Sequence, residues 1–126
     1  MIEWNEELPE QCPPKDSVSP EGMTMYRFCK NEIPNESDFI SQRMLQPHKF
    51  FNDVDECTAR SLSVLNDLEA CQNKLKLPRT RKNFSSISEL NLSENDGLIK
   101  KTFNDPNHYS WWRSKSFTID SIIKVI

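Results

Sequence analysis

Glycine is almost absent from this chain, with only Gly22 and Gly97 among 126 residues. Loops that cradle phosphate groups, both the P-loop and the dinucleotide-binding turn, need several closely spaced glycines because the backbone must approach the ligand. No stretch of this sequence has that spacing. Nucleotide binding through a glycine-rich loop is therefore excluded.

Clustered metal ligands and a catalytic triad are also missing. The four cysteines are separated by 17, 28 and 14 positions, with no CxxC pair and no histidine close by. This spacing disfavours zinc. The only histidines, His48 and His108, have no nucleophile or acid at a catalytic-motif spacing. We expect no metal site and no cofactor.

Cysteine context indicates the redox state of the chain. No secretory signal precedes the cysteines, and Cys29, Cys57 and Cys71 lie in apolar contexts typical of reduced core thiols. The even number leaves two disulfides as the alternative. We expect four reduced thiols in a cytoplasmic protein. No apolar run approaches the length that spans a bilayer, so we expect no membrane partner.

The net charge of -3 hides an asymmetry between the two halves of the chain. Residues 1–72 hold 6 Lys/Arg against 14 Asp/Glu, giving -8, whereas residues 73–126 hold 10 against 5, giving +5. If the two halves form separate faces, this separation of charge gives the molecule a dipole, which orients it on a partner protein or on its own copy. In the alternative, the two halves attract each other within one domain. The basic run at 79–82 predicts a solvated face, because the net acidic charge argues against generic binding of duplex nucleic acid.

Chain length and pattern predict a single α+β domain over residues 1–126. This length has room for one core, and the low hydrophobic content of 36% means that aromatic residues must supply much of it. We expect about five mostly antiparallel strands with two to three short helices. Residues 1–22 are an acidic, proline-rich lead-in, which we expect to pack onto the domain through Trp4.

The stretch 57–78 carries the clearest local signals. A short apolar run at 62–65 predicts a strand, and Asn66 follows it as a helix cap. Apolar residues at helical spacing predict a helix over 67–76 that ends before Pro78.

The remaining elements follow from alternation, caps and turn residues. Helical turns are expected at 35–43 and 53–59. A hairpin is expected between the segments 84–92 and 98–103, because an Asn-Asp-Gly turn joins them. Further strands are expected at 23–30, 108–112 and 117–126.

Aromatic residues near the end of the chain form the best candidate binding surface. Side chains alternate along a strand, so Trp111 and Trp112 should face opposite ways. We predict that Trp112 is core and that Trp111 lies outside with His108, Tyr109 and Arg113, where rings and a cation contact a ligand or partner. In the alternative interpretation both tryptophans are core anchors with bonded indole N–H groups.

Arg27 on the first predicted strand and Ser63 on the 62–65 strand suggest a second candidate site. With Ser41 and Ser61 they resemble the scattered polar set of a small transferase. The alternative is that Arg27 pairs with one of the many carboxylates of the acidic half.

Four short motifs occur in a characteristic order along most of the chain. They are YR at 26–27, DFIS at 38–41, LSVL at 62–65 before a helix, and HYSWW at 108–112. This order resembles small bacterial proteins of uncharacterised function. An arginine on an early strand followed by a serine on a later one is also similar to compact ADP-ribosyltransferase-type folds. That resemblance implies an enzymatic site at Arg27, Ser63 and His108, with Glu89 as the nearest candidate for an acidic member.

Two functions of different classes follow. The first is a small cytoplasmic interaction or accessory protein that acts through a partner protein or self-association, in a bacterial immunity, toxin-related or regulatory system. The second is a compact ADP-ribosyltransferase-like or other nucleotide-handling enzyme. An enzyme needs a concave pocket where Arg27, Ser63 and His108 converge, whereas a binding protein needs an exposed apolar patch.

Overall fold

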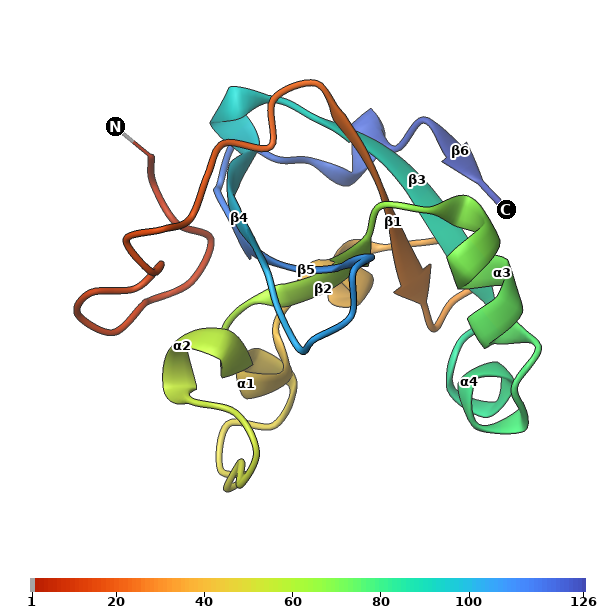
Figure 1. Cartoon of the computed structure of the whole chain (residues 1–126), viewed down its shortest axis with the longest axis horizontal. Coiled ribbons are helices and arrows are strands. Elements are labelled where there is room, and N and C mark those ends of the chain that lie inside the picture. The colour runs from red at the N-terminus through yellow and green to blue at the C-terminus, as the bar shows by residue number, and fades with distance from the viewer. Residues whose placement is uncertain (1) are drawn as a thin grey trace.

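The computed structural model describes residues 2–126, which form one α+β domain on a six-stranded antiparallel sheet (Figure 1). The strand order is β4-β5-β2-β1-β3-β6. Within the described residues, four short α-helices and three 3-10 helices connect the strands. The predicted fold class is confirmed, with six strands instead of about five.

The elements have the following bounds. The strands are β1 Met23–Cys29, β2 Leu62–Leu65, β3 Ser86–Leu92, β4 Gly97–Lys101, β5 His108–Arg113 and β6 Lys124–Val125. The helices are α1 Gln42–Leu45, α2 Glu56–Ala59, α3 Leu68–Leu75 and α4 Pro78–Asn83, and the 3-10 helices are η1 Glu36–Phe39, η2 Glu94–Asp96 and η3 Ile119–Ser121.

The sheet is strongly curled, which brings β3 and β4, strands from opposite ends of the strand order, close together. β3 and β4 are far apart in the strand order, yet only η2 separates them in sequence. Figure 1 shows the chain passing from β3 through the single turn of η2 directly into β4. The predicted hairpin between these two segments is therefore wrong: β4 pairs with β5, and β3 pairs with β1 and β6.

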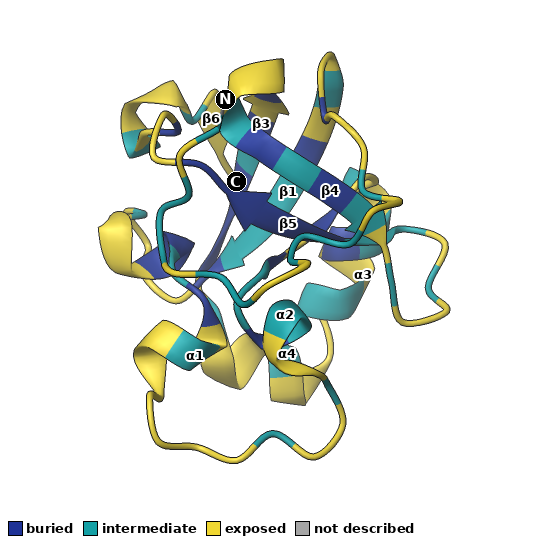
Figure 2. Ribbon diagram, turned by 90° about the vertical axis from the view of Figure 1, so that its left-hand side faces the viewer, coloured by how far each residue is buried: buried dark blue, intermediate teal, exposed yellow. Residues whose placement is uncertain are grey.

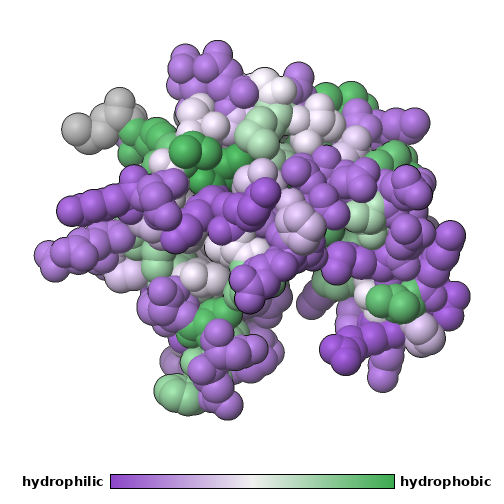
Figure 3. Space-filling model, in the orientation of Figure 1, coloured by the Kyte–Doolittle hydropathy of each residue, from purple (hydrophilic) through white to green (hydrophobic). Residues whose placement is uncertain are grey.

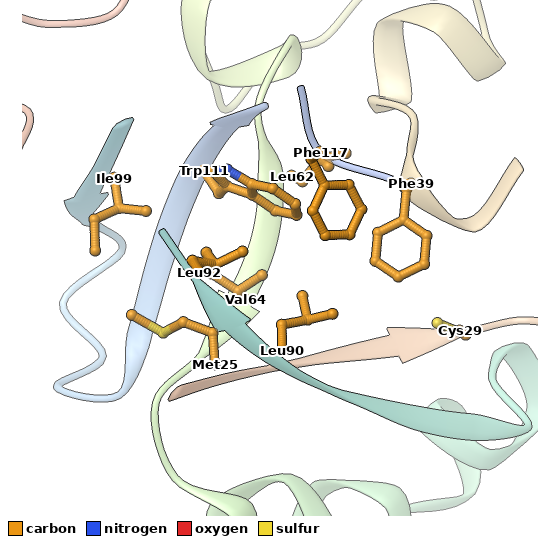
Figure 4. Close-up of a cluster of buried hydrophobic side chains, with 10 residues drawn as sticks. All are labelled: Met25, Cys29, Phe39, Leu62, Val64, Leu90, Leu92, Ile99, Trp111 and Phe117. Atoms are coloured by element: carbon orange, nitrogen blue, oxygen red, sulfur yellow. The ribbon is translucent and has the colours of Figure 1, made fainter. Parts of the chain in front are cut away.

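The main hydrophobic core fills the inner side of the curled sheet (Figure 4). Its buried members come from β1 to β5 and from two covering segments that contribute Phe39 and Phe117. The ring of Phe117 lies edge-on to Trp111, with ring centroids 4.9 Å apart, and its centroid is 5.4 Å from that of Phe39. Aromatic residues thus anchor the core, as the composition predicts. β5 is buried along most of its length (Figure 2).

A smaller core lies on the outer side of the sheet, beneath α3. Leu65, Cys71 and Ile87 are its buried members. The predicted helix exists, but its cap is Asp67, which makes no side-chain capping bond, and the predicted Asn66 cap is wrong. Pro78 ends α3 as expected and also begins α4, because proline at the first helical position loses no hydrogen bond.

The lead-in contacts the rest of the chain at several separate points. Trp4 forms a bridge with Ser114, and Val18 forms one with Ile99, so the segment touches the strand layer at both ends. Glu6 accepts a hydrogen bond from the Ser41 hydroxyl at 2.8 Å, and burial raises the pKa of this carboxyl.

Cys12 of the lead-in is joined to Cys57 of α2 by a disulfide. The prediction of four reduced thiols is wrong for this pair, whereas Cys29 and Cys71 are free and buried. The disulfide could not be predicted from local sequence, because the two cysteines are 45 positions apart and meet only when the lead-in folds back onto α2.

The C-terminal stretch differs from the prediction of a long strand. Only the two residues of β6 pair with β3, after the single turn of η3. Ile123, Val125 and Ile126 remain exposed at this edge of the sheet. No helix within residues 2–126 combines the length and the apolar character that crossing a bilayer requires.

Candidate functional site

Both tryptophans of β5 are buried, which contradicts the predicted outer position of Trp111. Trp111 is 0% exposed and donates its indole N–H to the carbonyl of Asp96 at 2.9 Å. Trp112 is 1% exposed and donates to the carbonyl of Cys57 at the same distance. The side chains do alternate, but the second face of β5 is also covered, because the disulfide-linked α2 lies over it. The alternative interpretation, two core anchors, is the one observed.

Arg113 is likewise buried, with 8% of its surface exposed. It forms an ion pair with Glu36 at 2.6 Å and donates to the carbonyls of Phe39 and Phe117. It also lies over the Phe117 ring, 5.2 Å from its centroid. Arg113 therefore ties η1 and the segment after β5 to the core, and it is not a surface cation.

His108 and Tyr109 remain partly exposed, but they face away from each other. His108 Nδ1 lies 2.9 Å from the Thr102 hydroxyl. The His108 ring packs against Phe103, with centroids 4.9 Å apart and the ring planes tilted by 58°. Burial lowers the pKa of His108 below its usual value. Tyr109 packs against the main core, with Lys101 5.8 Å from its ring centroid. The four predicted binding residues thus do not form one surface.

Arg27 and Ser63 come together, as the second candidate site requires. Arg27 Nε donates to the carbonyl of Asp38 at 2.7 Å, and its Nη1 donates to the carbonyl of Ser63 at 2.8 Å. Arg27 keeps some exposure, but burial of the guanidinium lowers its pKa to about 10. The predicted pairing of Arg27 with a carboxylate is not observed among residues 2–126, since both bonds go to main-chain oxygens.

These residues line a hollow of about 140 Å³ between α1 and the end of α4. A second hollow of about 290 Å³ shares Gln42, Ser61 and Ser63 with the first, and we call the two together the β2 cleft. Figure 3 shows a notch in the surface between the part over α1 and α2 and the part over α4. His108 lines neither hollow, so the three residues of the predicted enzymatic site do not converge.

Asp38 is a buried carboxylate in the wall of this cleft. Its two oxygens accept hydrogen bonds from the backbone N–H groups of Lys30 and Asn35 and from the Asn31 side chain, at 2.8 to 3.0 Å. The same carboxylate closes the capping box of η1. Its acceptor sites are therefore used to order the 30–39 segment. Glu89, the predicted acidic member, lies outside the cleft. It stands opposite Lys124 in the register of β3 and β6.

An apolar groove lies on the opposite side of α4, where sequence reasoning placed no site. It has a volume of about 420 Å³, and we call it the α3–α4 groove. Leu75, Phe84, Ile87 and Ile126 form its floor and walls. The remaining lining residues are polar or basic: Gln72, Lys76, Arg81 and Ser85.

The charged residues that line this groove, Lys76 and Arg81, are both basic. Five cations lie within residues 74–82, and no Asp or Glu occurs between Glu69 and Glu89. Ile126, which lines the groove, directly follows β6, an edge strand whose outer side pairs with no other strand of residues 2–126. In Figure 3, hydrophobic patches near β6 and near α4 stand among hydrophilic side chains. The sequence holds two signals for this surface, the basic run at 79–82 and the apolar C-terminal residues. No local sequence pattern predicts that these two segments lie side by side in the fold.

Metal binding has no support in the described residues, since no three His, Cys, Asp or Glu side chains of residues 2–126 are grouped as ligands. Similarity to other proteins adds nothing to the geometry. No protein-family model, curated protein or solved structure matches this chain.

Proposed function

We propose that this protein is an interaction module that binds a partner protein at the α3–α4 groove. The observation that carries the proposal is an apolar groove whose two charged lining residues, Lys76 and Arg81, are both basic, next to an unpaired edge strand. Apolar surface that remains exposed on a small domain commonly marks an interaction site. The exposed residues Leu77, Ile123 and Val125 extend this apolar surface beyond the groove.

The occupant that fits is an extended, acidic segment of the partner. An extended peptide can add to β6 as a further strand, with main-chain hydrogen bonds supplying affinity and alternate side chains supplying specificity. One apolar side chain would fill the space between Leu75 and Ile126, and carboxylates would face Lys76 and Arg81. Complementary charge steers such an encounter and increases its rate at low salt.

The second candidate function, a nucleotide-handling enzyme, is favoured by one observation, the shared hollow at Arg27 and Ser63. One feature of the same site weighs against it, because His108, the third residue of the expected enzymatic site, lies outside the β2 cleft.

A direct test uses a synthetic peptide of alternating glutamate and valine as the probe, followed by fluorescence anisotropy. We expect binding that weakens as salt increases, and that is lost in a double Lys76→Glu, Arg81→Glu variant. A peptide of alternating lysine and valine is the matched control and should not bind. The double variant Lys15→Glu, Lys115→Glu, at two exposed sites outside the groove lining, changes the net charge by the same amount and is the matched protein control.

Other occupants of the groove give distinct results. Sedimentation that reveals salt-sensitive dimers abolished by Arg81→Glu would identify a second copy as the occupant. Equal binding of both peptides, or binding that survives the double variant, would refute the groove as the site.

The cytoplasmic location stays a prediction, and the Cys12–Cys57 disulfide argues for an oxidising compartment instead. Fractionation of the native host, with thiols blocked at lysis, decides between the two.

A further inference from the structure

Arg113, which is buried, and Arg27, which is partly buried, differ in how their charges are balanced. Arg113 has a carboxylate partner, Glu36, at 2.6 Å. Arg27 has no carboxylate within ion-pair distance among residues 2–126, and its two hydrogen bonds go to neutral carbonyl groups. Removing a charge from water is costly unless the charge is paired. A bound anion would therefore stabilise the charged guanidinium of Arg27.

No neighbouring carboxylate among residues 2–126 bonds to the Arg27 guanidinium. Asp38 is close enough to favour the charged form of Arg27, but its oxygens accept their hydrogen bonds from three N–H donors of the 30–35 segment instead. Burial raises the pKa of the Cys29 thiol, which therefore stays neutral near pH 7. Lys30, which also lines the hollow, adds a second positive charge.

We propose that the Arg27 end of the β2 cleft binds an oxyanion, the carboxylate or phosphate group of a small molecule. Arg27 lines this hollow, and its Nη2 makes no hydrogen bond within residues 2–126, so a donor remains for the ligand. Guanidinium groups suit such ligands because their planar set of donors matches carboxylate and phosphate oxygens.

The dimensions of the cleft restrict the ligand to a small acid. The hollow beside Arg27, about 140 Å³, accepts an anionic group and little more. The body of the ligand extends past the shared residues Ser61 and Ser63 into the second hollow, where Phe51 and Phe103 provide apolar contact. This site is separate from the interaction function proposed above.

Thermal unfolding in the presence of inorganic phosphate or acetate tests the site, with chloride at equal ionic strength as the reference. Ligands that bind only the native state raise its midpoint. We expect one of the two anions to produce a saturable rise in the wild-type protein and in Arg79→Gln, an exposed control on α4. Arg27→Gln, which keeps a donor but removes the charge, should lose that rise.

The two anions distinguish the sources of the oxyanion. A response to phosphate alone identifies a phosphorylated ligand, and a response to acetate alone identifies a carboxylic acid. If neither anion shifts the wild-type midpoint beyond chloride, or if Arg27→Gln responds like wild type, the proposal is wrong. Should Arg27→Gln fail to fold, titration of the wild-type protein followed by the Arg27 Nε–Hε NMR signal gives the answer. An unmoved signal then overturns the site.

Discussion

Replacing Gly97 with alanine should destabilise this protein severely. Gly97 begins β4 with φ +131 and ψ -153, a region that residues with a side chain rarely adopt. A Cβ atom at this position would lie 2.0 Å from the carbonyl oxygen of Trp112 and 3.0 Å from Nε1 of Trp111. The first of these atoms belongs to the backbone of β5, so no side-chain rotation relieves the overlap.

The magnitude follows from three contributions. The backbone conformation costs about 1–3 kcal/mol for a residue with a Cβ atom. Displacing the packed β5 backbone costs about 1–3 kcal/mol more. The shift also threatens the hydrogen bond from Trp111 to Asp96, which contributes about 0.5–1.5 kcal/mol. We therefore expect Gly97→Ala to lower the free energy of unfolding by roughly 2.5–7.5 kcal/mol.

Gly22→Ala provides the matched control. Gly22 also has a positive φ, +76, but no atom lies within 4 Å of a Cβ built on it. This variant should lose only about 1–2 kcal/mol, the cost of a left-handed conformation. Urea denaturation followed by tryptophan fluorescence measures both, with the disulfide intact. A midpoint for Gly97→Ala no lower than that for Gly22→Ala would refute the close approach of β4 to β5.

Three further predictions concern the tryptophans, the thiols and pH. Trp111→Ala and Trp112→Ala should each lower the free energy of unfolding by about 3–5 kcal/mol, and a near-neutral effect of either in urea denaturation would show that it is not core. Alkylation of the unreduced, unfolded chain should modify two thiols, and mass spectrometry that finds four would contradict the disulfide. Burial lowers the pKa of His108 from 6.5, so the unfolded chain binds its proton more readily and stability should fall as pH drops below about 6.5. This acid sensitivity should be smaller in His108→Gln than in the exposed control His48→Gln, and equal pH profiles would show that His108 does not contribute.

Local sequence determined most of the individual elements. Alternation in the MTMYRFC segment specified β1, and the apolar run at 62–65 specified β2, because both signals depend only on residues that are neighbours in the chain. The helical turns around Ser41 and Asp55 were equally predictable, since each side chain caps the backbone a few residues later. The class of fold followed from these elements.

Tertiary structure decided how the elements combine, because strand pairing, burial and charge balance depend on residues distant in sequence. Strand alternation correctly separated Trp111 from Trp112, but it did not reveal that α2 covers the second face of β5. Arg113 and Glu36 meet only because η1 closes over the core, and no carboxylate of residues 2–126 forms such a pair with Arg27. The candidate sites are therefore products of the fold: the unpaired charge at Arg27 and the α3–α4 groove arise where separate segments approach one another in space.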